Sequence, residues 1–197
     1  SVKKILTEEI IDTDATVKGW LRSVRNSKKF SFLVLNDGSS QDNLQIIVDE
    51  VLPNYAEVAG LLSGSAVAVT GRLVRGGGKV QSIEMQAKSV EIIGKTDETT
   101  PLQKKATSLE FLREQAHLRI RTNTFGAIMR IRHHLAMATH EFFSNRGFYY
   151  LNSPIISGVD AEGAGEMFTV STMASDITKS PKTKEGKLDF SRDYFGK

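Results

Sequence analysis

The sequence predicts an all-β barrel of five strands followed by the beginning of an α+β domain. Three observations lead to this prediction. Segments with strand character fill the first hundred residues, the apolar residues change to helical spacing near residue 124, and a polar stretch separates the two regions. The chain has 197 residues, of which 40% are hydrophobic. It is therefore long enough for one large domain or two small ones with a buried core.

Five segments in the first hundred residues are rich in β-forming residues. They cover residues 15–24, 30–35, 44–48, 65–74 and 80–93. Turn-forming residues follow the second segment at 36–39 and the fourth at 75–79. Gly71 interrupts the fourth segment, and this predicts a β-bulge.

A short helix is expected between the third and fourth segments, at 53–62. Pro53 begins it, and Val58, Leu61 and Leu62 have helical spacing. Three strands, a short helix and a strand pair follow one another in the order of an OB-fold, which is a five-stranded Greek-key barrel. The sequence therefore predicts an OB-fold over residues 1–95.

The polar residues 94–107 are expected to form a linker, and 108–121 a short helix with a loop, so that residues 96–121 join two domains. A helix of about twenty residues is predicted near 124–145. Its apolar stripe advances in steps of three and four, through Phe125, Ile128, Arg132, Leu135, Thr139 and Phe142. Strands at 148–151 and 167–171, a glycine-rich loop at 155–165 and a polar, mobile tail at 179–187 complete a second domain over 122–197.

Composition excludes several classes of function. Without cysteine the chain has no disulfide, thiolate metal site or cysteine nucleophile. The first ten residues are polar and no apolar run approaches the ~18 residues of a spanning helix, so a cytoplasmic protein without a membrane partner is expected. His133 and His134 are adjacent and face different directions on a helix, so no metal site is expected. The net charge of +3 is too weak to indicate nucleic acid by itself, although positive charge concentrates between residues 104 and 146.

Side chains on the outer face of the barrel suit unpaired bases. Alternation along the strands places Phe32, Gln45 and Glu84 on that face, with Arg25 nearby. An aromatic ring stacks on a base for ~1–3 kcal/mol, while amide and carboxylate groups can read its edge. The alternative, in which the linker covers Phe32 and Gln45 is ordinary surface, remains open from this pattern alone.

Several runs of the sequence resemble the class IIb aminoacyl-tRNA synthetases. Residues 19–25, 32–38 and 44–45 are similar to their anticodon-binding OB-fold, and residues 146–154 resemble motif 1 of class II enzymes. The run 112–123 and the loop 160–168, Asp-Ala-Glu-Gly-Ala-Gly-Glu-Met-Phe, resemble the asparaginyl enzymes in particular. The resemblance covers nearly the whole chain.

This resemblance implies roles for residues of the barrel. Phe32 would stack on the central anticodon uridine, and Gln45 would hydrogen-bond its edge. Arg25 and Glu84 match positions that contact anticodon nucleotides in the related aspartyl enzymes. The implied partner of the barrel is the anticodon of tRNA(Asn), with no DNA partner.

For the second domain the resemblance implies a substrate contact and an interface. Glu162 would accept hydrogen bonds from the α-ammonium group of asparagine. The motif 1 helix and strand would form a homodimer interface that includes Phe125, Arg132 and Pro154.

The implied parent reaction activates asparagine with ATP and magnesium and transfers it to tRNA(Asn). Motifs 2 and 3, which carry the arginines that grip ATP, do not occur in the 197 residues. The chain is therefore expected to be an N-terminal portion with no catalytic residue of its own, no bound cofactor and no activity alone. A fragment of an aspartyl-type enzyme and a stand-alone OB-fold RNA-binding module remain alternatives.

Overall fold

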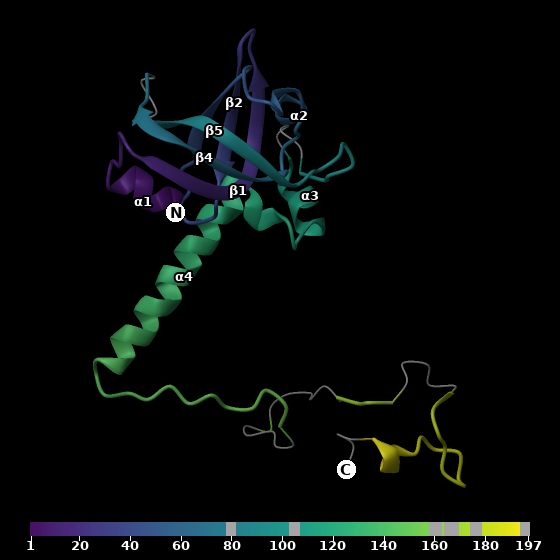
Figure 1. Cartoon of the computed structure of the whole chain (residues 1–197). Helices are drawn as coiled ribbons and strands as arrows, with labels where there is room; N and C mark the ends of the chain where they lie inside the picture. The colour runs from purple at the N-terminus through teal and green to yellow at the C-terminus, as the bar shows by residue number, and fades with distance from the viewer. Residues whose placement is uncertain (78–81, 103–106, 158–162, 164–169, 174–178, 194–197) are drawn as a thin grey trace. The chain divides into compact units, whose positions relative to one another are not determined.

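Five strands close into a barrel in the order β1-β2-β3-β5-β4 (Figure 1). Strands β3 and β5 pair in parallel and all other neighbours pair antiparallel. The short helix α2 (Tyr55–Ala59) lies between β3 and β4 in the sequence. This arrangement confirms the OB-fold predicted from the order of the elements. The strands are β1 (Asp14–Asn26), β2 (Phe30–Asn36), β3 (Leu44–Asp49), β4 (Ala66–Arg75) and β5 (Ile83–Gly94).

The computed structural model describes residues 1–77, 82–102, 107–157, 163, 170–173 and 179–193. The chain divides into two compact units, Ser1–Thr139 and His140–Lys197, and each is described by itself. The first unit contains the barrel and most of the long helix α4 (Asn123–Ser144).

The barrel core follows the two-residue period of its strands. Buried and partly exposed residues alternate along β2 and β3, as expected when one face of a sheet lines a core and the other meets solvent. The inward side chains of the barrel are predominantly aliphatic, including Leu33, Leu35, Leu44, Ile46, Val48 and Met85.

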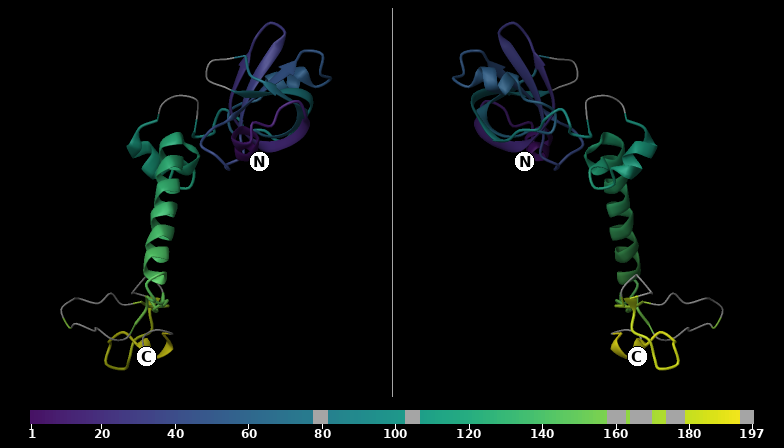
Figure 2. Two further views of the ribbon diagram at one scale, coloured as in Figure 1. Left: turned by 90° about the vertical axis from the view of Figure 1, so that its left-hand side faces the viewer. Right: turned by 90° about the vertical axis from the view of Figure 1, so that its right-hand side faces the viewer.

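Helix α1 (Val2–Thr7) packs against this core and was not predicted from the sequence (Figure 2). The Ser1 hydroxyl accepts a hydrogen bond from the Lys4 amide and caps the helix. Val2 and Ile5 are buried among the barrel residues. With only six residues, α1 depends on this tertiary packing, because isolated helices of such length are unstable in water.

Three shifts in strand register shape the barrel, two in the β4–β5 pairing and one in the β1–β2 pairing. One β4–β5 shift lies at Gly71, where the glycine predicted a bulge, and the extra residue is Lys88 of the paired strand β5. In β1 the register shifts between Leu21 and Ser23, where the sequence gives no comparable signal. The shift in β1 changes the parity of that strand, so that Ser23 and Arg25 lie on the outer face of the barrel.

The segment after the barrel begins with α3 (Leu109–Glu114) and the 3-10 turn η1 (Arg119–Arg121), and α4 follows. The long helix predicted near 124–145 is confirmed and corresponds to α4. The strand predicted at 148–151 is wrong, because these residues pair with no strand among the residues that the structure describes and are largely exposed. A β-strand is stable only as part of a hydrogen-bonded ladder.

The C-terminal segment is polar, as predicted, but it is folded locally. Lys182 and Leu188 form an isolated bridge, and the 3-10 turn η3 (Phe190–Arg192) follows. The buried Asp193 carboxylate accepts hydrogen bonds from the Ser171 and Thr172 hydroxyls. Most of the strand predicted at 167–171 lies outside the described residues, and residues 170 and 171 are not in a strand.

The carboxylate of Asp37 links the β2–β3 loop to α1, and it makes stability depend on pH. Partial burial opposes ionisation, but hydrogen bonds from the Ser39 hydroxyl and from the Val2 and Ser39 amides outweigh it and lower the pKa of Asp37. A carboxyl group whose pKa is lower in the folded chain stabilises the fold above its unfolded pKa of ~3.9, and this contribution is lost as pH falls through the folded pKa.

We therefore expect the Asp37→Asn variant to lose less free energy of unfolding than the wild type between about pH 5 and pH 3. Urea unfolding at a series of pH values measures this difference. The substitution removes only this carboxylate, so parallel curves for the two proteins would contradict a stabilising role for ionised Asp37.

Candidate nucleic-acid interface

Two rows of side chains cross the outer face of the barrel from β1 to β5. The strand pairing sets Arg25 opposite Phe32, Phe32 opposite Ile47 and Ile47 opposite Gln86. The adjacent row is Ser23, Val34, Gln45 and Glu84. Phe32, Gln45 and Glu84 are all partly exposed on this face, and Arg25 is exposed. The structure thus places on one accessible surface the three residues predicted to share it, together with Arg25, which was predicted to lie nearby.

Arg25 covers the aromatic ring of Phe32. Its guanidinium carbon lies 4.9 Å from the ring centroid, which is cation–π distance. A base that stacks on this ring must move the guanidinium aside. An exposed cation–π contact is worth about 0.5–1 kcal/mol, whereas stacking of a base on an aromatic ring is worth ~1–3 kcal/mol. For a base bound on this ring, stacking would therefore outweigh the lost cation–π contact.

Gln45 and Glu84 are joined by a hydrogen bond across the parallel pairing of β3 and β5. The Gln45 amide donates from Nε2 to Oε1 of Glu84 at 2.8 Å. An ionised carboxylate only accepts, so this bond fixes which way the amide points. Gln45 keeps its carbonyl oxygen and a second amide hydrogen for a ligand. A fixed pair of one donor and one acceptor distinguishes uridine from cytidine, because the two bases present donor and acceptor in opposite order.

A second group of contacts, which sequence analysis did not identify, joins the barrel to the start of α4. Arg22 donates to the Arg121 carbonyl and to Oδ1 of Asn123. Burial, and then the nearby Arg121, lower the pKa of Arg22. The Arg121 guanidinium lies 4.6 Å from the centroid of the Trp20 ring. The only sequence signal for this contact region is the concentration of basic residues after Lys104.

The remaining predicted site residues have separate surroundings. Phe125 is half-buried, with the Arg119 guanidinium 4.9 Å from its ring centroid, and Arg132 is exposed on α4. Pro154 is exposed in the second unit. Glu162 and most of the loop 160–168 lie outside the described residues.

Within the described ranges, no group of three or more His, Asp or Glu side chains could hold a metal ion. None of the described helices is long and apolar enough to cross a membrane.

Two protein-family models match this chain. Residues 15–93 match the OB-fold nucleic acid binding domain, and residues 108–184 match the class II tRNA synthetases of the D, K and N group. The first match coincides with the barrel, and the second includes α4.

Curated relatives match all or nearly all of the chain. It is 47% identical over 199 residues to the asparagine–tRNA ligase of Cytophaga hutchinsonii, and the match covers 100% of this chain and 42% of the relative. It is 50% identical over 190 residues to the asparagine–tRNA ligase of Acetivibrio thermocellus, covering 96% of this chain and 40% of the relative. The chain thus spans about two-fifths of the length of these relatives.

Solved structures with the same fold include the asparaginyl-tRNA synthetase of Pyrococcus horikoshii, also determined in complex with asparaginyl-adenylate. Its TM-score is 0.67 at 24% identity, and the match covers 75% of this chain and 36% of that protein. The asparaginyl-tRNA synthetase of Entamoeba histolytica in complex with asparaginyl-adenylate gives 0.66 at 22% identity, covering 76% and 36%. At such identities the likeness establishes the fold alone.

Proposed function

The chain belongs to the asparaginyl-tRNA synthetase family of class II, and on this premise we propose that its barrel binds the anticodon of tRNA(Asn). The parent enzyme would activate asparagine with ATP and transfer it to that tRNA in the cytoplasm. The domain boundaries we propose are residues 1–95 for the anticodon-binding barrel, 96–121 for the joining segment and 122–197 for the first part of the catalytic domain.

The observation that carries this proposal is the shared outer face of Arg25, Phe32, Gln45 and Glu84. An aromatic platform beside a fixed amide provides both general affinity for a base and discrimination between bases. The Arg25 cation adds attraction for phosphate. Proteins that read single-stranded RNA combine these three elements.

The test is the affinity of the chain for two anticodon stem–loops that differ only in the central base. We expect the stem–loop with central uridine to bind more tightly than the one with central cytidine, because the Glu84 carboxylate fixes the orientation of the Gln45 amide. Fluorescence anisotropy at constant salt measures both dissociation constants. Equal affinity for the two RNAs would contradict anticodon reading by this face.

In the second domain we propose that Glu162 accepts hydrogen bonds from the α-ammonium of asparagine. A partly dehydrated ammonium group needs a carboxylate partner, which supports this assignment. The asparagine carboxylate would take the adenylate group of ATP with release of pyrophosphate, and AMP would leave when asparagine is transferred to the tRNA. Magnesium would neutralise charge on the phosphates of ATP. The described residues offer no ligand cluster for magnesium, so we assign no step of adenylate formation to them.

We also propose that α4 contributes to a homodimer interface, together with Phe125, Arg132 and Pro154. Ile128, Ile131, Leu135 and Met137 on this helix are 40–63% exposed. Burial of such apolar side chains against a second copy would stabilise a dimer by ~25 cal/mol per Å².

Replacing Leu135 by aspartate is expected to shift a micromolar dimer to monomer, because the substitution places a charge in the buried interface. Leu135 is 63% exposed in the single chain, so the folded monomer should tolerate it. Light scattering measures the mass. Leu109, which is 49% exposed on α3, provides the matched control as Leu109→Asp. A wild-type chain that is monomeric at this concentration would count against the interface.

A further inference from the structure

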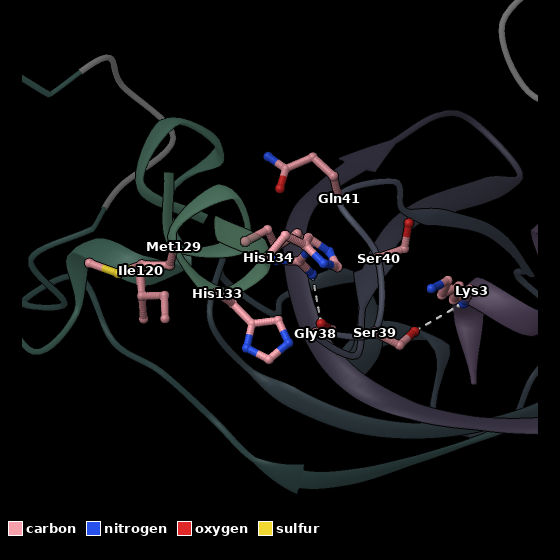
Figure 3. A pocket seen from close by; sticks show the side chains of 10 residues that line it. Lys3, Gly38, Ser39, Ser40, Gln41, Ile120, Met129, His133 and His134 are labelled. Atoms are coloured by element: carbon pink, nitrogen blue, oxygen red, sulfur yellow. Dashed lines mark hydrogen bonds between the residues drawn. The ribbon is translucent and has the colours of Figure 1, made fainter. Parts of the chain in front are cut away.

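A cleft of about 550 Å³ lies where the β2–β3 loop meets the start of α4, away from the four residues assigned to the anticodon (Figure 3). Loop residues Gly38 to Gln41 line one side, and Met129 and Arg130 of α4 line another, together with two histidines of that helix. Lys3 of α1 completes the wall. All the lining residues belong to the first compact unit.

The cleft is lined by cationic and donor groups. Lys3 and Arg130 carry positive charge, and the imidazole rings of His133 and His134 each offer an N–H donor. His133 and His134 follow Arg130 by three and four residues, so each lies within one turn of it along α4, and all three line the cleft. No carboxylate is among the described residues that line the cleft. The nearby Asp37 carboxylate is already engaged by hydrogen bonds from Val2 and Ser39.

Some of these residues hold the cleft together, and others are available to a ligand. Arg130 donates to the Gly38 carbonyl at 2.7 Å, and the Lys3 backbone amide donates to the Ser39 hydroxyl at 3.0 Å (Figure 3). Within the described part of the chain, the Lys3 ammonium and the imidazoles of His133 and His134 have no hydrogen-bond partner. The walls are therefore fixed while three donor side chains remain unpaired.

We propose that this cleft binds a backbone phosphate of the RNA whose anticodon the barrel reads; the inference rests on the proposed function. Several hydrogen-bond donors that line one cleft, with no carboxylate among them, are suited to the oxygen atoms of a phosphate group. The chemistry favours RNA over an acidic polypeptide because the barrel in the same compact unit carries the base-reading face. A phosphate contact carries no sequence information, so this site would add affinity and position the RNA without reading bases.

The experiment uses the full chain, two tRNA(Asn) transcripts with central uridine or central cytidine, and the triple variant Lys3→Ala/His133→Asn/His134→Asn. These substitutions leave the bonds from the Lys3 amide and the Arg130 guanidinium intact. We expect the variant to bind both transcripts about tenfold more weakly, with an unchanged ratio between them. The slope of log K against log salt concentration should fall by about 1. Lys184→Ala, which removes one exposed charge in the second unit, is the control and should bind like the wild type.

The outcomes separate this inference from the function on which it rests. If the triple variant keeps wild-type affinity and salt slope while the wild type still prefers central uridine, the cleft does not bind RNA phosphate and anticodon reading stands. An acidic polypeptide would then be the better candidate ligand. If the triple variant loses the preference for uridine, the cleft is not a sequence-independent contact. If the wild type binds neither transcript, both proposals fail.

Discussion

Replacing Phe32 by alanine is expected to weaken binding of the central-uridine stem–loop by ~1–3 kcal/mol, a roughly 5- to 150-fold increase in Kd. The ring lies on the outer face with the exposed Arg25 guanidinium 4.9 Å from its centroid, so a base could take the place of that cation. Alanine removes the platform and leaves Gln45 and Glu84 in place. Fluorescence anisotropy with labelled RNA measures the change, and thermal unfolding verifies that the barrel is intact.

Two further substitutions at this position separate stacking from simple apolar contact. Phe32→Tyr retains a ring and should retain most of the affinity, whereas Phe32→Leu retains volume without a π-face and should behave like alanine. Phe190→Ala removes an exposed ring, 40% accessible, from the second unit and should have no effect. If leucine binds as tightly as phenylalanine, Phe32 does not stack on a base.

The barrel could be predicted from the sequence because the residue patterns that indicate its strands lie within short segments of the chain. Side-chain alternation in 30–35 and 44–48 determines which residues line the core, and the structure confirms that Phe32 and Gln45 point outward. Gly71 marked a bulge because glycine within a strand often does so. These inferences need only the two-residue period and the conformational behaviour of one residue type.

The features that were missed depend on contacts distant in sequence. Helix α1 is stabilised by burial of Val2 and Ile5 in a core formed by residues much later in the chain. The bond between Gln45 and Glu84 joins positions 39 residues apart through a parallel pairing that no local pattern specifies. The strand at 148–151 was predicted wrongly from a local pattern. Its residues favour β structure, but they have no partner strand in the described structure.

Replacing Gly71 by alanine is expected to lower the free energy of unfolding by about 3 kcal/mol. A Cβ atom at this position would lie 2.9 Å from the carbonyl carbon of Gln86 and still closer to its oxygen, and 3.0 Å from the Cα of Ala87. These are backbone atoms of the paired strand β5, so no side-chain rotation can relieve the contact. Urea unfolding measures the loss. The m-value should be unchanged, because the substitution alters stability and not the surface exposed on unfolding.

Gly94→Ala is the matched control, because a Cβ at the end of β5 would meet no atom within 4 Å. It should leave stability nearly unchanged. The consequence of Gly71→Ala reaches the outer face proposed to bind the anticodon, since relief of the contact requires β5 to move at Gln86, two residues from Glu84. The Gln45–Glu84 bond would then lengthen, and the variant should discriminate less between uridine and cytidine even at temperatures where it is fully folded. Full stability in Gly71→Ala would show that the strands separate at little cost. Loss of stability with unchanged discrimination would show that Glu84 does not set the orientation of Gln45.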